Sequence, residues 1–354
     1  MNPPAVSPSP LDRATTWLRR RLGRAVLIAY TAALLVPWMG LWLRHPHTVA
    51  VGPAHLTVRT TSLLLSLVLF SAGLQVPVRA LGRVLRRPKA ILAGLALHVA
   101  IPLLVVPFVA FLLRRTPDTD GGSGLLTAMI LIVAMPVAAG ATVWTTKGEG
   151  DQPTMVGLVL ASTLLSPLTT PLLLTALAPL LHGGYAHTLS STSGSTQGGF
   201  TLATVVLPCA AGLLCALVLQ PPSHGRLLQS MVPASMTGSL VLTYANASGA
   251  LGSFLVKPRP LLFVAALVVA AVVCLLSFAL GRLAARVLRL DAPVASSLTL
   301  ACGMNNSSAS AVLITTSLPD KPHLLLPVLA YGLLQKSAAN RVVARLRTTS
   351  HMLS

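Results

Sequence analysis

Ten apolar runs, most of them close to twenty residues long, follow one another along this chain of 354 residues. A helix of about 20 apolar residues matches the roughly 30 Å hydrocarbon core of a bilayer. In lipid, only helices and closed barrels satisfy all backbone polar groups. The runs therefore predict an all-α polytopic membrane protein with ten transmembrane helices, at about 26–43, 57–75, 90–113, 124–146, 154–180, 200–220, 227–250, 260–281, 293–317 and 323–345.

The net charge of +19 would suggest a nucleic-acid partner in a soluble chain, but only 9% of these residues are charged and 54% are hydrophobic. With the N-terminus inside, 19 of the 26 lysines and arginines fall in segments placed in the cytoplasm. Such a bias follows the positive-inside rule. The charge thus predicts a protein integral to the cytoplasmic or plasma membrane, with both termini cytoplasmic and no nucleic-acid partner.

Two of the runs are interrupted at bilayer depth. The fourth breaks at Met135–Thr142, with Pro136 and Gly140 in the break, and the ninth breaks at Gly303–Ser308. Irregular backbone at that depth is tolerated only inside protein or beside a wet cavity, and matched breaks in two halves indicate a carrier's binding site. We expect Pro136, Gly140 and Gly303 to shape the backbone where the two broken helices cross.

A Gly/Ser/Thr-rich stretch at 182–199 divides the runs into two sets of five. An odd number of spans per set inserts the second half upside down, so the chain predicts an inverted five-plus-five repeat. The expected segments are a basic cytoplasmic N-terminus at 1–25, a first repeat at 26–181, an outer linker at 182–199, a second repeat at 200–346 and a cytoplasmic tail at 347–354.

The segment Phe70–Leu74, the first break, the run Ser162–Pro167 with Pro171, and the second break occur in an order that resembles the bile acid/sodium symporter family. The resemblance covers about residues 26–345. It implies a core domain of spans 3–5 and 8–10, with spans 4 and 9 crossing, that rocks against a panel domain of spans 1, 2, 6 and 7. It also implies alternating-access transport of small or amphipathic organic anions. The arsenite-exporter branch is an alternative, although its cysteine in the fourth span is missing here.

Family members hold sodium through side-chain oxygens on spans 3, 4, 5 and 9. The corresponding positions here are occupied by Leu97, Ala141, Thr142, Met155, Val159, Ala301 and Asn305. Sodium is a hard cation that requires oxygen ligands. The resemblance therefore implies sodium coupling that is weak or absent, with coupling to protons or no coupling as the alternatives.

Polar residues at the breaks are the candidate ligands of the transported anion. They are Thr142, Asn305, Asn306, Ser307 and Ser308, together with Gln335 and Lys336 in the tenth run. Amide and hydroxyl groups beside the positive ends of half-helices can hold a carboxylate. The alternative is that these small polar residues serve helix packing.

Two ionisable residues lie within the apolar runs, and with Thr142 and Asn305 they are the candidates for ion coupling. His98 can titrate near physiological pH, or it is a neutral histidine packed beside Pro102. Lys336 either supplies a tethered positive charge to the anion or extends its ammonium to the cytoplasmic surface. In the first case, anion binding would favour protonated Lys336 and make transport pH-dependent.

No cofactor, metal or soluble-enzyme motif is predicted, because the seven carboxylates all fall in termini or loops and no phosphate-binding or nucleophile motif occurs. The four cysteines lack metal spacing and are interpreted as small packing residues. A channel or passive facilitator is the alternative to a carrier, although no pore-loop motif supports it. An enzyme would have to rely on Glu149 and Asp151, which are more simply interpreted as loop residues.

Overall fold

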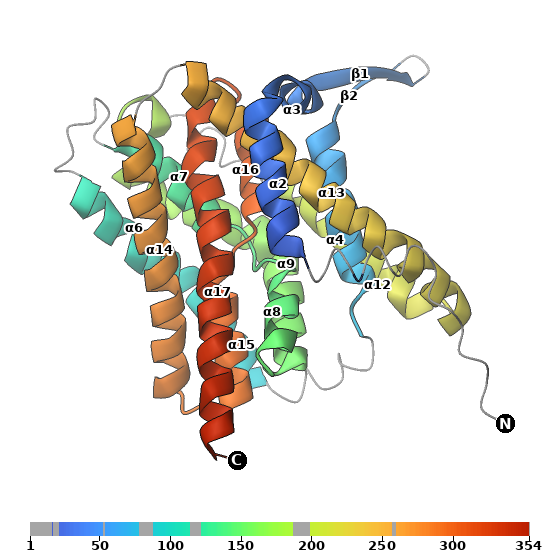
Figure 1. The fold of residues 1–354 in the computed structure, drawn as a ribbon, viewed down its shortest axis with the longest axis vertical. Coiled ribbons are helices and arrows are strands. Elements are labelled where there is room, and N and C mark those ends of the chain that lie inside the picture. The colour runs from blue at the N-terminus through green and yellow to red at the C-terminus, as the bar shows by residue number, and fades with distance from the viewer. Residues whose placement is uncertain are drawn as a thin grey trace. The chain divides into compact units, whose positions relative to one another are not determined.

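The computed structural model describes residues 16, 21–51, 54–77, 88–113, 122–186, 199–256 and 260–353, which are helical apart from loops and one hairpin (Figure 1). Most of the predicted linker at 182–199 and of the N-terminus at 1–25 lies outside these residues. The chain forms two compact units, each made of two separate stretches. Unit 1 is Met1–Val76 with Pro208–Gly252, and unit 2 is Pro77–Leu207 with Ser253–Ser354.

Unit 1 is built from a few helices and the hairpin. Its elements are α2 (Leu22–Leu35), α3 (Pro37–Arg44), β1 (Pro46–Val51), β2 (Ala54–Arg59), α4 (Thr60–Leu74), α12 (Leu207–Val218) and most of α13 (Pro221–Val256). Glycines allow α4 and α12 to meet backbone to backbone. A Cβ on Gly73 would overlap the carbonyl oxygen of Cys209, and one on Gly212 would overlap that of Phe70. Small residues commonly permit such close helix contacts in membranes.

The first predicted span, at 26–43, is divided between two helices, α2 and α3. The chain leaves the helical conformation at Val36 (φ −132°, ψ 61°), and α3 turns by 96° relative to the preceding helix. Pro37 explains the break, because a residue before proline is disfavoured in the α conformation. The Tyr244 hydroxyl from α13 donates to the freed Val36 carbonyl.

Between α3 and α4 the structure contains a β-hairpin, which the sequence did not predict. Strands β1 and β2, of six residues each, pair antiparallel from Pro46 opposite Arg59 to Val51 opposite Ala54. The second predicted span was expected to begin at residue 57, but α4 begins at Thr60. No strand was predicted for this segment, and Thr57 fell within the predicted second span.

Unit 2 contains the remaining helices. They are α6 (Pro88–Leu113), α7 (Ser123–Val133), α8 (Ala141–Lys147), α9 (Gln152–Leu177), η1 (Ala178–Leu180), η2 (Leu202–Val206), α14 (Pro260–Val287), α15 (Ala292–Gly303), α16 (Ser307–Ser317), η3 (Pro322–Leu324) and α17 (Leu325–Leu353). Nearly every residue of α7 is buried, as are Ala309–Thr315 of α16. These half-helices therefore form the centre of the unit. The predicted tail at 347–354 continues α17 as far as Leu353.

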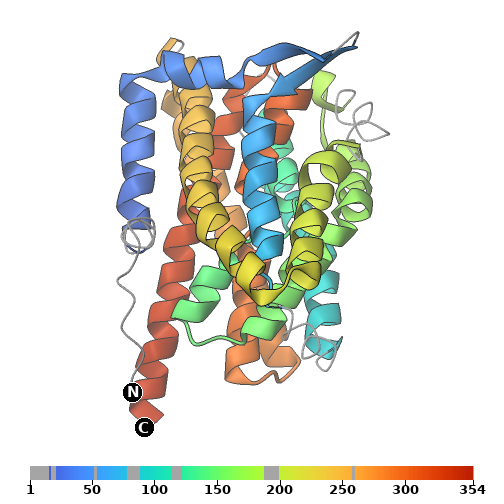
Figure 2. The same ribbon diagram turned by 90° about the vertical axis from the view of Figure 1, so that its right-hand side faces the viewer.

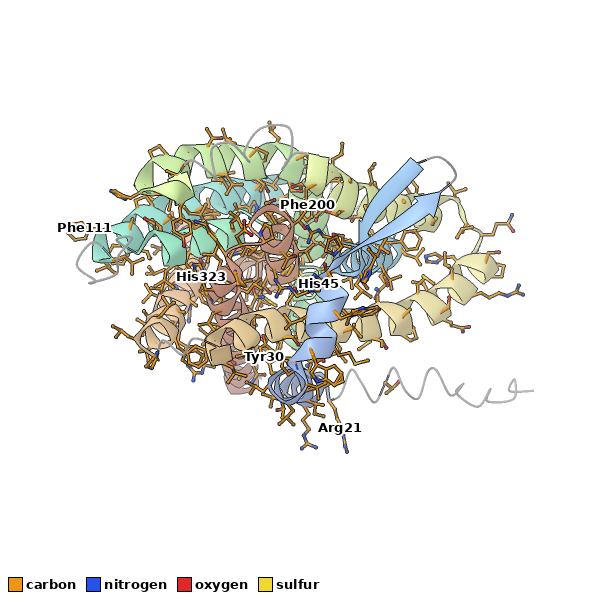
Figure 3. All side chains as sticks on the ribbon, turned by 90° about the horizontal axis from the view of Figure 1, so that it is seen from above. Arg21, Tyr30, His45, Phe111, Phe200 and His323 are labelled. Atoms are coloured by element: carbon orange, nitrogen blue, oxygen red, sulfur yellow. The ribbon has the colours of Figure 1, made fainter. Side chains whose placement is uncertain are left out.

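Four described helices are long and apolar enough to cross a membrane, and the bent pair α2/α3 would make a fifth. The four are Pro88–Leu113, Gln152–Leu180, Gly199–Val218 and Pro260–Val287. The broken helices α7 and α15 are apolar but too short to count singly. Apolar side chains cover the outside of such helices, as Phe111 on α6 illustrates at the edge of unit 2 (58% exposed; Figure 3).

Candidate functional site

Both predicted breaks are present, and each separates two half-helices. The first runs from the end of α7 at Val133 to the start of α8 at Ala141, and the second runs from Gly303 to Ser307. Pro136 has no backbone N–H to donate, so a helix through it would lose a hydrogen bond. Because Pro136 lies between α7 and α8, neither helix loses a hydrogen bond to it.

The two breaks pair with each other. The Ala138 N–H donates to the Met304 carbonyl (2.8 Å), and the Asn306 N–H donates to the Pro136 carbonyl (3.0 Å). Between them, Val137 and Asn305 form an antiparallel bridge. We call residues 134–140 and 304–306 the crossover (Figure 1 shows α7, α8, α15 and α16 meeting there). This pairing satisfies backbone groups that lipid could not.

Helix α9 supports the first half of the crossover. The Val137 N–H donates to the Ser162 hydroxyl (3.1 Å), and the Thr170 hydroxyl donates to the Ala134 carbonyl (2.8 Å). Both side chains are buried. Ser162 was used only as part of the family resemblance and Thr170 was not singled out, although two hydroxyls eight positions apart in an apolar helix lie on the same side of it and were a usable signal.

Tyr331 of α17 supports the second half. Its hydroxyl donates to the Gly303 carbonyl (3.1 Å) and accepts from the Asn305 side-chain amide (3.0 Å). Tyr331 is fully buried, and Asn305 is 4% exposed. Asn305 was predicted as a substrate ligand, but here its amide nitrogen braces the crossover. Tyr331 was missed because a tyrosine within an apolar run carries no pattern of its own.

The other predicted residues at the second break lie at the start of α16. Asn306 is its N-cap, and the side-chain oxygen of Asn306 accepts from the Ala309 N–H (3.1 Å). Asn306, Ser307 and Ser308 are half-buried, so each retains some accessible surface. The Gln335 amide nitrogen lies 3.4 Å from the Ser307 hydroxyl, while the buried Gln335 Oε1 has no hydrogen-bond partner within the part of the chain that the structure describes.

At the first break, Gly140 is exposed, and Ala138, Ala139 and Thr142 are half-buried. The Thr142 hydroxyl donates to the Ala139 carbonyl (2.8 Å). Helices α8 and α16 both begin at the crossover, so their N-terminal N–H groups are directed toward it. Partial positive charge at helix starts favours a nearby anion.

Lys336 lies on one face of α17, between a residue that packs beside the crossover and a residue that packs on α8. One turn earlier, Gly332 packs on Ser307, since a Cβ on Gly332 would lie 2.9 Å from the Ser307 Oγ. Two turns later, Val343 packs on the end of α8, where a Cβ on Gly148 would lie 3.0 Å from the Val343 Cγ2. Residues 332, 336, 339 and 343 share one helical face. Lys336, which is half-buried, therefore lies alongside α8, between the crossover and the end of α8.

His98 is not joined to the crossover by any hydrogen bond among the described residues. It lies on α6, is 7% exposed, and its Nε2 has no hydrogen-bond partner in the described part of the chain. One turn earlier, Gly94 packs against Leu158 of α9 and Leu298 of α15. The predicted role of His98 in ion coupling stays a prediction.

Two carboxylates, Glu149 and Asp151, follow α8, and Asp151 has structural contacts. Asp151 is the N-cap of α9, and its carboxylate accepts from the Thr154 N–H (2.9 Å). The Ser297 hydroxyl on α15 donates to the Asp151 carbonyl (3.0 Å). Glu149 is exposed, in a left-handed turn (φ 53°). Within the described residues, no three metal-ligating side chains come together.

Comparison with known proteins gives one family and two relatives. Residues 62–257, more than half of the chain, match the sequence model of the sodium bile acid symporter family. YbaS of Bacillus subtilis (strain 168), named as an uncharacterized protein, is 25% identical over 277 residues, which are 78% of this chain and 85% of YbaS. YocS of the same organism, named as an uncharacterized sodium-dependent transporter, is 25% identical over 257 residues, which are 72% of this chain and 73% of YocS.

Proposed function

Because this chain belongs to the sodium bile acid symporter family, and is thus an integral membrane protein of a transporter family and not an enzyme, we propose that it carries a small or amphipathic organic anion by alternating access. The observation that carries this proposal is the crossover, where two broken helices pair through their backbones within unit 2. Paired discontinuous helices of this kind form the substrate sites of many secondary carriers.

The proposed architecture is ten spans in an inverted five-plus-five repeat, with both termini in the cytoplasm. Counting each broken pair, α7 with α8 and α15 with α16, as one span supports this number. Unit 2 corresponds to the core domain and unit 1 to the panel domain of the family resemblance. The division of the chain at residues 76/77, 207/208 and 252/253 supports that assignment.

The proposed anion site consists of the accessible polar groups of the crossover and the charge beside it. Thr142, Asn306, Ser307 and Ser308 supply hydroxyl and amide groups, Gln335 supplies a buried amide, and Lys336 supplies a cation. Among the described residues, no carboxylate pairs with Lys336. An intramembrane charge costs about 2.5–3.5 kcal/mol on insertion scales, so it is retained more readily when it has a use.

The position of Lys336 within α17 bears on the alternative, in which its ammonium extends to the membrane surface. Lys336 lies seventeen residues before the last residue of α17, about 26 Å at 1.5 Å per residue. Val343, two turns further along, still packs against the end of α8. These positions favour an ammonium near the crossover over one extended to solvent.

We propose further that sodium coupling is weak or absent. Leu97, Ala141, Met155, Val159 and Ala301 offer no side-chain oxygen where the family resemblance places sodium ligands. Thr142 and Asn305 leave two side-chain oxygens, and both residues also make structural hydrogen bonds, Thr142 to the Ala139 carbonyl and the Asn305 amide nitrogen to Tyr331. The name of YocS favours the opposite, and the same experiment decides between the two.

Uptake into proteoliposomes tests the function. The protein is first screened against organic anions for thermal stabilisation, because a ligand that binds only the folded state must stabilise it. The anion with the largest shift is then used for transport. Saturable uptake with counterflow supports a carrier, linear uptake without counterflow supports the alternative of a channel, and a steep sodium requirement would contradict weak sodium coupling.

A further inference from the structure

Helix α3 has the character of a helix lying on a membrane surface. It turns by 96° from the preceding helix and lies across the end of α2 (Figure 2). Its side chains Trp38, Met39 and Trp42 are 67%, 57% and 60% exposed. Tryptophan is enriched where the hydrocarbon core meets the lipid head groups, and short helices with such faces lie in that plane. This places the end of α3 at the level of the lipid phosphates.

Two arginines meet at that end. Arg44 is the last residue of α3, and Arg59 is the last residue of β2. The hairpin places Pro46 opposite Arg59, only two residues beyond Arg44. Burial of Arg44, and after it the charge of Arg59, lowers the pKa of Arg44 to about 10. Figure 3 shows His45 at this junction. The contact between the Trp42 and His47 rings, with centroids 4.9 Å apart, fixes α3 against β1.

Helix α13 forms a recess for the Arg44 side chain. Gly249 is the residue beneath it, and a Cβ at that position would overlap the Arg44 Nη1. Arg44 is half-buried, and its Nε is a buried donor that finds no hydrogen-bond partner among the described residues. A buried donor left unpaired is costly, so the recess is suited to a ligand that accepts hydrogen bonds.

Unit 1 supplies no carboxylate to balance this charge. Asp12 is the only acidic residue in its two stretches, and it lies outside the described residues. The position of Arg44 at the carbonyl end of α3 is favourable in itself, but it gives the Nε no acceptor. A phosphate fits, because guanidinium groups bind its oxygens in pairs and with charge assistance.

From this geometry we propose that Arg44 and Arg59 form a binding site for the phosphate of an anionic membrane lipid. The exposed tryptophans beside the pair favour a lipid over a free oxyanion, because the acyl chains would lie along the apolar side of α3. The site is independent of the proposed transport function, so its test uses binding and not uptake.

The probe is phosphatidylglycerol, added to the purified full-length protein in detergent and counted by native mass spectrometry. We expect Arg44→Gln and Arg59→Gln each to weaken binding of one lipid by about tenfold. Arg226→Gln, which removes an exposed arginine from the other end of α13, should bind as the wild type does. Gly249→Ala should also weaken binding, because it displaces Arg44 without changing the charge.

The thermal transition of each variant shows whether it is folded. If Arg44→Gln does not fold, Arg44→Lys and Arg59→Gln carry the test, since Arg44→Lys keeps both charges but removes the guanidinium fork, and Arg59→Gln keeps one charge. Lipid retention by Arg59→Gln and Gly249→Ala equal to that of the wild type would overturn the site. Stabilisation by inorganic phosphate that depends on Arg44, without any preference for phosphatidylglycerol over phosphatidylcholine, would overturn the assignment to a lipid.

Discussion

At the scale of single residues, a substitution of Lys336 tests whether a cation of the protein contacts the anion. Lys336→Met should weaken anion binding about tenfold to a hundredfold, because a hydrogen bond to a charged group is worth about 1.5–3 kcal/mol. It should also remove any pH dependence of uptake, since anion binding favours the protonated amine. The measurements are the thermal shift with the anion and uptake between pH 5 and 9. Arg341→Met, an exposed cation lost from the same helix, is the control. Unchanged binding and an unchanged pH profile in Lys336→Met would eliminate the tethered cation.

Asn306 tests the polar side of the site. Asn306→Ala removes both the helix cap and a group able to orient the anion, so it should lower stability by about 1 kcal/mol and weaken binding. Asn306→Asp keeps the cap but places a negative charge at the site. We therefore expect Asn306→Asp to restore thermal stability but not anion binding, as measured by unfolding and by ligand-induced shifts. If Asn306→Asp binds the anion like the wild type, Asn306 is only a cap.

At the scale of elements, the crossover depends on braces from neighbouring helices. Ser162→Ala leaves the Val137 N–H without its acceptor, and Tyr331→Phe removes the hydroxyl shared by Gly303 and Asn305. Each substitution should lower the free energy of unfolding by about 1–3 kcal/mol, because a buried group is left unpaired. Thermal unfolding in detergent measures this. Ser230→Ala, at an exposed serine of α13, should have almost no effect. A negligible change in both variants would show that the breaks are held by their mutual backbone pairing alone.

The sequence predicted the positions of both breaks but not how they are held. Pro136 and the polar cluster at 303–308 are local signals, because each makes an uninterrupted helix costly. The braces depend on contacts that α9 and α17 make with the crossover, between residues at least 25 positions apart in the sequence. Hydrophobic periodicity does not specify contacts of that kind. The kink at Val36 had a local signal in Pro37, but the apolar pattern continued past it and outweighed that signal. The hairpin lay mostly between two predicted spans, and its short alternation was not recognised as a pair of strands.

At the scale of the whole molecule, the missing side-chain oxygens predict which ion drives transport. Uptake of the anion should change less than twofold when external sodium is replaced by choline, because five of the family's seven ligand positions offer no side-chain oxygen. Proteoliposomes with and without a pH gradient measure the alternative coupling in the same preparation. A saturable sodium dependence would instead show that carbonyls, Thr142 and Asn305 suffice as ligands.

The central claim is that the crossover holds the transported anion. In a variant whose four cysteines are replaced, a single cysteine is introduced at the half-buried Ser308 by Ser308→Cys, and its rate of alkylation is measured with and without the anion. Ser223→Cys, at an exposed position of α13, is the control. The account predicts that saturating anion slows alkylation at position 308 severalfold and leaves position 223 unchanged. Equal rates at position 308 with and without an anion that is still transported by the variant would contradict it.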